Sequence, residues 1–271
     1  FAARFTDFSV APETMALMQA MVQAGEVAHL VPERVWQEIS RGLMQAQPER
    51  MFAVLRACGA LAVLLPELDR LWGVPQRADY HPEVDPGLHT MLVLGQAVQQ
   101  QAPLAVRWAC LVHDLGKGTT PADVLPRHIG HEQRGAKLVR QVGERWRVPR
   151  DCTELAELVA YEHGNIHRSL DLSAAAMLRL LQRCDALRKP ERFAQALWAC
   201  ECDARGRWGF EDAAYPQRAR LQQALAVVLG VATGPIAAGA VAAGKKGAAI
   251  GQAVDAVRVQ ALAATLNKPP L

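Results

Sequence analysis

The sequence predicts an all-α protein with a helical neck or body, a central helical bundle and a helical C-terminal tail. Apolar residues recur at helical spacing along most of the 271 residues, and no run alternates as a convincing strand would. Pro32 and Pro103 stand where helices are expected to begin. Hydrophobic residues make up 51% and charged residues 21%, which is typical of a globular chain that buries a sizeable core.

Residues 1–75 are expected to form the neck or body. Pro32 opens a helix whose apolar residues share one face, namely Val35, Ile39 and Leu43. A short helix is expected near 48–57, and an apolar stretch follows at 61–65. The segment 73–87 is rich in turn-forming residues and is interpreted as a linker or loop.

Residues 76–205 are expected to form the central bundle. The predicted helices cover approximately residues 89–98, 104–115, 131–146, 151–163, 173–187 and 190–205. The helix over 104–115 is apolar almost all round, which is typical of a buried central helix. Residues 116–130 contain two prolines and are expected to form a long loop.

Residues 206–271 are expected to form the tail, with helices near 216–229 and after residue 247. The Ala/Gly-rich stretch between them is either a flexible linker or a segment whose small residues permit close helix packing. The tail holds seven Lys and Arg against three Asp and Glu. This excess suggests an anionic partner, although a soluble basic surface explains it equally well.

The sequence argues against membrane insertion and disulfide bonding. It has no apolar run long enough to cross a bilayer and no basic-then-apolar N-terminal signal. The six cysteines are scattered without CxxC spacing, so free thiols in a reducing cytoplasm are the simplest interpretation. We therefore expect a cytoplasmic protein without a membrane partner. Because the first residue is Phe rather than Met, the natural protein is expected to begin further upstream.

Histidines and aspartates stand at the ends of the expected helices. His89 begins one helix, and His113 and Asp114 end the next. About 13 residues lead up to the turn at Pro103 and about 11 lead back, roughly 20 Å each way at 1.5 Å per residue. The hairpin therefore returns Asp114 to the level of His89. Asp203 lies near the end of a later helix.

The next hairpin repeats this arrangement, because His131 begins a helix and His163 ends its partner. All these helix ends could meet on one side of a bundle, where helical proteins build metal sites. Imidazole and carboxylate ligands suit a divalent ion such as Ni²⁺, Mn²⁺, Fe²⁺, Zn²⁺ or Mg²⁺, which acidifies water and polarises a phosphoryl oxygen. The expected ligands are His89, His113, Asp114 and Asp203. His131 and His163 are expected to bind a second metal ion or to contact a substrate phosphate.

Cations in the loop after residue 114 suit a phosphate. Lys117 is expected to hold it by charge and to complete the catalytic set with His113 and Asp114, while Arg127 and His128 assist. A lone buried His–Asp pair is usually a hydrogen-bonded structural pair, and a lone helix-terminal His usually complements the helix dipole. The conjunction of these residues favours a metal site instead.

The segment 113–117, His-Asp-Leu-Gly-Lys, resembles the HD superfamily of phosphohydrolases. The similarity extends to the bacterial tRNA CCA-adding enzymes, which are tRNA nucleotidyltransferases that also carry an HD domain. Further segments that carry this resemblance are 33–38, 59–61, 64–69, 80–83, 89–90, 131–135, 162–163, 203–207 and 244–250. The central bundle is thus expected to be of the HD type.

The resemblance implies two activities in the complete enzyme. The HD domain would hydrolyse 2′,3′-cyclic phosphates, 2′-nucleotides and other phosphoesters, while the rest of the protein holds tRNA during CCA addition. The family's nucleotidyltransferase head, which uses Mg²⁺, CTP and ATP, is not recognised in this sequence. We therefore expect a C-terminal part, comprising neck, HD domain and tail, which does not add nucleotides by itself.

The resemblance also suggests contacts to tRNA at Glu33 and Arg34 and at Lys245 and Lys246. The first pair fits an ordinary charged helix face equally well. The second pair either lies in a simple linker or holds RNA phosphate beside the amides of a helix N-terminus. Two alternatives to the CCA-adding enzyme stay open: a free-standing HD nucleotide phosphohydrolase without affinity for tRNA, and a non-catalytic tRNA-binding body whose HD site is structural.

Overall fold

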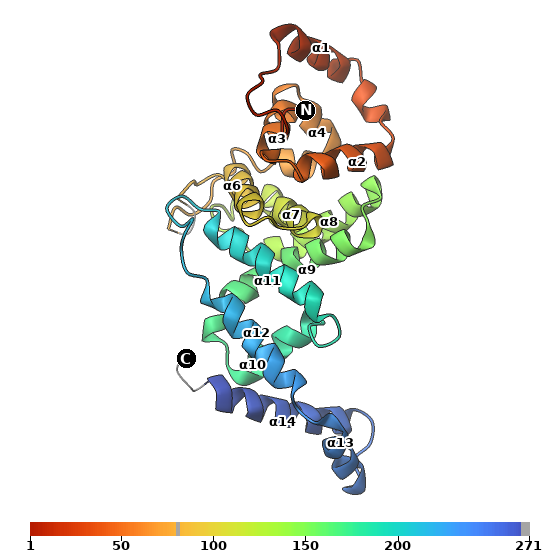
Figure 1. Cartoon of the computed structure of the whole chain (residues 1–271), viewed down its shortest axis with the longest axis vertical. Helices are drawn as coiled ribbons and strands as arrows, with labels where there is room; N and C mark the ends of the chain where they lie inside the picture. Colours follow the sequence, from red (N-terminus) through yellow and green to blue (C-terminus); the bar gives the residue numbers. More distant parts are fainter. Residues whose placement is uncertain (80–81, 267–271) are drawn as a thin grey trace. The chain divides into compact units, whose positions relative to one another are not determined.

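The computed structural model describes residues 1–79 and 82–266, and these residues form helices and connecting loops without a strand (Figure 1). The all-α prediction is therefore confirmed. Tyr80 and His81, which belong to the segment 80–83 that carries part of the resemblance, lie outside the described residues. The α-helices are α1 (Pro12–Gln23), α2 (Pro32–Leu43), α3 (Pro48–Ala57), α4 (Ala60–Leu64), α5 (Pro66–Asp69), α6 (Pro86–Gln99), α7 (Leu104–Val112), α8 (His131–Trp146), α9 (Arg150–His167), α10 (Ala174–Arg183), α11 (Pro190–Arg205), α12 (Pro216–Leu229), α13 (Thr233–Ala242) and α14 (Ala248–Leu266). Three short 3₁₀ helices are η1 (Glu26–His29), η2 (Leu115–Thr119) and η3 (Ser169–Asp171).

The chain forms two compact units. Unit 1 comprises Phe1–His163 and Trp198–Ala214, and unit 2 comprises Gly164–Leu197 and Tyr215–Leu271. These units differ from the expected neck, bundle and tail, which were divided after residues 75 and 205. The difference has a physical reason: the tail helices α12 and α14 contact α10, which the sequence analysis assigned to the bundle.

Unit 1 is held together by the helices that follow the N-terminal segment. Helix α2 contacts α7 and α8, while α3 contacts α6. As expected from its apolar sequence, α7 is almost entirely buried from residue 106 to 112. The guanidinium of Arg107 donates to the carbonyl oxygen of Leu43 at 2.8 Å, which ties α7 to the end of α2. It also donates to the carbonyl oxygen of Ala102, just before α7, at 2.8 Å. Since buried carbonyl groups are normally paired, the bond to Leu43 helps to specify how α2 and α7 meet.

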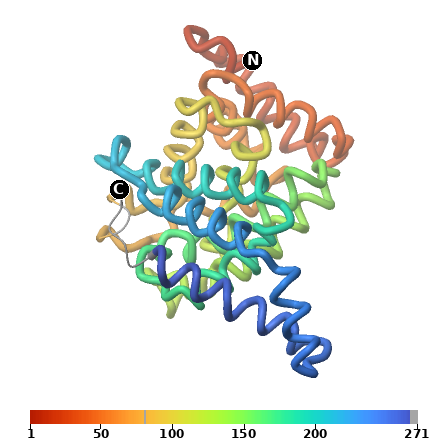
Figure 2. Tube along the Cα trace, turned by 60° about the horizontal axis from the view of Figure 1, so that its bottom comes forward, coloured from red at the N-terminus to blue at the C-terminus, as the bar shows by residue number. Residues whose placement is uncertain are grey.

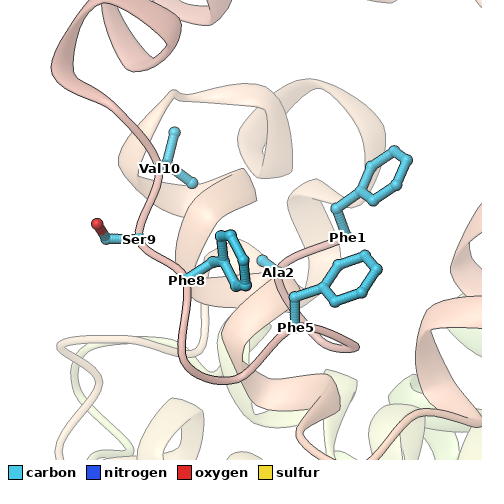
Figure 3. A pocket seen from close by; sticks show the side chains of 6 residues that line it. All are labelled: Phe1, Ala2, Phe5, Phe8, Ser9 and Val10. Carbon is cyan, nitrogen blue, oxygen red and sulfur yellow. The ribbon is translucent and has the colours of Figure 1, made fainter.

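The start of the chain forms a loop and a helix that the sequence patterns did not predict. Helix α1 buries none of its residues completely, and its half-buried side chains are Met15, Met18 and Val22. A pocket of about 330 Å³ lies beside the preceding loop, and Figure 3 shows the rings of Phe1, Phe5 and Phe8 around it. Its lining contains none of the histidines or carboxylates that the sequence analysis singled out.

Unit 2 packs its helices around α14. In Figures 1 and 2, α14 (dark blue) runs beside α12, and it also contacts α10 and α13. The Ala/Gly-rich stretch is helical as α13, which favours the interpretation that its small residues permit helix packing. Among the described residues no single helix is long and apolar enough to cross a membrane, and α12 and α13 pass that test only together, across a 50° bend.

Candidate metal centre

The ends of five helices, α6, α7, α8, α9 and α11, bring the predicted residues together. Helix α6 begins at Pro86, one turn earlier than expected, and the carboxylate of Asp85 caps it by accepting from the N–H groups of Gly87 and Leu88. His89 thereby lies in the first turn of α6. The hairpin of α6 and α7 then returns the chain, as expected, so that His113 caps the C-terminal end of α7.

The second hairpin also behaves largely as the sequence predicts. His131 is the first residue of α8. Helix α9 continues to His167, so His163 lies one turn before its end rather than at the end. Asp203 occupies the last turn of α11. These placements bring side chains that are up to 114 residues apart in the sequence into contact.

A first group of possible ligands consists of His89, His113 and Asp203. Their nearest ligand atoms all lie within 4.8 Å of one another, and all three residues are buried. The Oδ1 atom of Asp203 is 2.9 Å from Nε2 of His89 and 3.7 Å from Nε2 of His113. One carboxylate oxygen therefore faces two imidazole nitrogens.

A second group consists of Asp114, His131 and His163. The Oδ1 atom of Asp114 is 3.4 Å from Nε2 of His131 and 3.7 Å from Nε2 of His163. The other carboxylate oxygen, Oδ2, is 3.2 Å from Nε2 of His113, which belongs to the first group. The two groups thus adjoin, and Asp114 lies between them.

All four histidines present the same nitrogen to these groups. In each ring, Nδ1 lies 2.7–3.0 Å from a backbone carbonyl oxygen. The carbonyls belong to Gly206 for His89, Cys110 for His113, His128 for His131 and Val159 for His163. A carbonyl can only accept, so Nδ1 carries the proton and the lone pair of a neutral ring is on Nε2.

The donor set fits a divalent metal ion. Within the described residues, Nε2 of His113 and Oδ1 of Asp114 are buried and have no hydrogen-bond partner, although buried polar atoms are normally paired. Four imidazole nitrogens and two carboxylates are ligands that Mn²⁺, Fe²⁺, Ni²⁺ and Zn²⁺ accept. Removing these groups from water is costly without a charge to compensate them, and a cation would provide it.

The charges in the centre compensate one another strongly. Burial alone would lower the pKa of His113, but the carboxylates of Asp114 and Asp203 raise it to about 9. Burial alone would raise the pKa of Asp114, but Lys117 and His113 hold it well below its usual range. In contrast, burial lowers the pKa of His163 to about 3, which keeps this ring neutral. A neutral imidazole is the form that binds a metal.

The residues expected to hold phosphate have different environments. Lys117 is buried, and its Nζ lies 2.7 Å from Oδ2 of Asp114 and 3.1 Å from Oε1 of Gln76. His128 is half-buried, with Nδ1 at 2.8 Å from Oγ1 of Thr120, and burial together with the charge of Lys117 lowers its pKa to about 4. Arg127 is exposed on the same loop. Of these three residues, Lys117 forms an ion pair with a residue of the two groups.

The residues expected to contact tRNA lie away from the two groups or on unit 2. On α2, Glu33 forms an exposed ion pair with Arg147 at 2.9 Å, and its neighbour Arg34 is exposed. Lys245 and Lys246 are exposed in the turn that precedes α14.

Two residues of the centre were missed because they lie in the loop before α6. Gln76 contacts Lys117, and Oε1 of Glu83 lies 3.0 Å from Nδ1 of His89. A loop has no periodicity that would indicate which side chain points inward. The available signal was the type of residue: Glu83 is a carboxylate six residues before an expected ligand, within a segment that carries the resemblance.

Two family models match this sequence. Residues 7–71 match the "probable RNA and SrmB-binding site of polymerase A", and residues 87–195 match the HD domain. The second match includes five residues of the two groups but ends before Asp203. The structure therefore adds Asp203 from outside the matched segment.

Proteins called "multifunctional CCA protein" are similar to nearly the whole chain. The protein from Paracidovorax citrulli is 69% identical over 97% of this chain, and the chain covers 62% of that protein. Those from Acidovorax sp. strain JS42 and Cupriavidus necator are 66% and 65% identical over 98% of the chain, which covers 63% and 64% of their lengths. The chain thus spans less than two thirds of the length of each of these relatives.

Proposed function

Because this chain belongs to the family of multifunctional CCA proteins, we propose that it is the C-terminal portion of a tRNA CCA-adding enzyme, in which its HD domain is a metal-dependent phosphohydrolase. The proposed substrates are 2′,3′-cyclic phosphates, 2′-nucleotides and phosphomonoesters. The observation that supports the hydrolase most strongly is the convergence of four Nε2 atoms and two carboxylates in two adjoining groups. Hydrogen bonds that Nδ1 donates to backbone carbonyl oxygens hold each ring in this orientation.

His89, His113 and Asp203 would hold one divalent ion, with Asp114 beside it. His131 and His163, with the Oδ1 atom of Asp114, would hold a second ion or contact the substrate phosphate. A bound divalent ion acidifies water and polarises a phosphoryl oxygen, which is the chemistry that phosphoester hydrolysis needs. Hydrolysis of a 2′,3′-cyclic phosphate adds one water molecule across a P–O bond and leaves a phosphomonoester.

The cations of the loop after Asp114 would bind the phosphate. Lys117 places an ammonium group beside the centre, in a buried position where charge acts strongly. His128 would be neutral at pH 7 and would donate or accept a hydrogen bond rather than supply charge. Arg127 is exposed and could reach a larger nucleotide from the rim.

The metal-dependent activity can be tested on this chain directly. We expect the chain to hydrolyse a 2′,3′-cyclic nucleotide when Mn²⁺ or Ni²⁺ is supplied and to lose this activity after chelation. Assays with each divalent metal, on one preparation, would establish the dependence. Absence of hydrolysis with every metal would refute the proposed hydrolase and favour a structural HD site.

The same preparation tests the division between the two activities. Given CTP, ATP, Mg²⁺ and a tRNA without its terminal CCA, this chain is expected to add nothing. Nucleotide addition needs paired carboxylates that hold Mg²⁺ against the incoming phosphates, and we expect the nucleotidyltransferase head of the full-length enzyme to supply them. Addition by this chain would show that it contains an unrecognised polymerase site.

The tail is proposed to contact tRNA through Lys245 and Lys246. Deleting the tail would be a poor test, because α14 contacts α10 and α12 and its loss would expose their apolar faces. Replacing both lysines by Ala should instead weaken tRNA binding several-fold and reduce the slope of log K against log salt by about 1.4–1.8, since each phosphate contact contributes about 0.7–0.9. Fluorescence anisotropy over a salt series measures both quantities.

Lys137→Ala is the control for tRNA binding, because Lys137 is an exposed lysine on α8 that no prediction assigns to RNA. It should change the affinity and the slope little. Wild-type affinity and slope in the double variant would assign Lys245 and Lys246 to solvation of the turn.

A further inference from the structure

Glu83 is an acidic residue whose side chain is completely buried beside the metal centre. It lies in the loop between α5 and α6, which is tied at several points. The N–H of Gly73 donates to Oδ2 of Asp85 at 2.8 Å, and the N–H of Gln76 donates to the carbonyl of Val84 at 3.1 Å. These bonds hold the loop against the start of α6, where His89 follows one turn later.

The carboxylate of Glu83 meets the nitrogen of His89 that faces away from the possible ligands. Oε1 of Glu83 and the carbonyl oxygen of Gly206 are each 3.0 Å from Nδ1 of His89. On the other side of the ring, Nε2 is 2.9 Å from Asp203. His89 thus lies between two carboxylates, and its exposed fraction is 0%.

This arrangement distinguishes His89 from the other histidines of the centre. The Nδ1 atoms of His113 and His163 meet backbone carbonyls at 2.8 and 3.0 Å. His131 has a carboxylate nearby, since Oε2 of Glu132 is 3.3 Å from its Nδ1, but its closer partner is a carbonyl at 2.7 Å, and the Glu132 side chain is 24% exposed. Among the residues the structure describes, Glu83 therefore differs from Glu132 in that its carboxylate is fully buried where it meets Nδ1 of a histidine of the centre.

We propose that Glu83 is a positioning residue of the metal centre: its carboxylate orients the imidazole of His89 and makes Nε2 a stronger metal ligand. A carboxylate that accepts a hydrogen bond from the Nδ1–H group increases the electron density at the opposite nitrogen and fixes the plane of the ring. Burying a carboxylate is costly unless it is paired, and the pairing with His89 gives the buried position of Glu83 a function. The inference rests on the proposed function, because it requires a metal at His89.

Metal affinity of the purified chain is the direct measurement. Calorimetric titration of Mn²⁺ into the metal-free protein should show about 10–100-fold weaker binding for Glu83→Ala, the range seen when partners of metal ligands are removed. Glu83→Gln keeps the size and one acceptor oxygen but not the charge, and it should weaken binding by less than Glu83→Ala. Glu132→Gln is the matched control, because it neutralises a carboxylate next to another histidine of the centre, and it should bind Mn²⁺ nearly as tightly as the wild type.

A second readout reports on His89 without metal. The Nδ1 proton of His89, assigned by its loss in His89→Gln, should resonate far downfield in the wild type and move upfield in Glu83→Gln but not in Glu132→Gln. If Glu83→Ala does not fold, Glu83→Gln decides the question alone.

The outcomes separate the two proposals. If the wild type binds no divalent metal, the proposed function fails, and this inference fails with it. If the wild type binds Mn²⁺ and both folded Glu83 variants bind it equally well, only the role of Glu83 is overturned. Equal weakening by Glu132→Gln would also overturn it, because any nearby negative charge would then explain the effect.

Discussion

Replacing Asp114 by Asn is expected to reduce phosphodiesterase activity by more than about 100-fold and to lower the bound metal. Replacing a residue that only supports a metal ligand costs about 10–100-fold in metal affinity or activity. Asp114 is itself a proposed ligand, so its replacement should cost more. One of its oxygens faces His113 and the other faces His131 and His163, so its charge serves both groups. Asparagine keeps the shape and removes this charge. Steady-state kinetics with a cyclic nucleotide, together with metal analysis, measures the effect.

The variant also removes the partner of a buried cation. Nζ of Lys117 is 2.7 Å from Oδ2 of Asp114, and breaking such a buried pair costs about 3–5 kcal/mol. A double variant, Asp114→Asn with Lys117→Met, removes the unpaired charge and should regain stability without regaining activity. Asp123→Asn, an exposed aspartate in the following loop, is the control and should behave as the wild type. Activity near the wild-type level in the folded Asp114 variant would contradict the assignment of the centre.

The sequence predicted the centre best where helix ends determine it. Counting residues along the hairpin from His89 to Asp114 predicted that the two ends meet, because helical rise per residue is constant. In the structure the ring centroids of His89 and His113 are 5.7 Å apart, and Nε2 of His131 is 3.4 Å from Oδ1 of Asp114, as that count and its repeat implied. Whether these residues bind metal is still a prediction.

The remaining features depend on contacts that no local pattern contains. Glu83 and Gln76 belong to a loop whose course depends on hydrogen bonds such as that from Gly73 to Asp85. The division into two units depends on which helices α14 contacts, and charge or helix boundaries do not determine that choice. Helix α1 is different, because Met15, Met18 and Val22 recur in it at helical spacing and would have indicated it.

A glycine next to the centre shows how closely two of its elements approach. Gly116 lies in η2, and a Cβ atom built on it would be 2.0 Å from the carbonyl oxygen of His131 and 2.6 Å from the backbone nitrogen of Gly135. Both atoms belong to the backbone of α8 and cannot rotate away. Contacts of this length are not tolerated, so any other residue at 116 must push η2 away from α8. That movement would separate Asp114, at the start of η2, from His131 at the start of α8.

Gly116→Ala should therefore destabilise the protein by about 3 kcal/mol or more, at the upper end of the cost of overpacking, and should also weaken metal binding. Gly118→Ala is the matched control, because the nearest atom to its added Cβ would be Cβ of Arg70 at 3.2 Å, which a small shift can accommodate. Chemical denaturation followed by circular dichroism gives the free energy of unfolding, and titration with Mn²⁺ gives the affinity. If Gly116→Ala has the same free energy of unfolding and the same affinity for Mn²⁺ as Gly118→Ala, then η2 can move without disturbing Asp114. The spacing between η2 and α8 would in that case not determine the geometry of the centre.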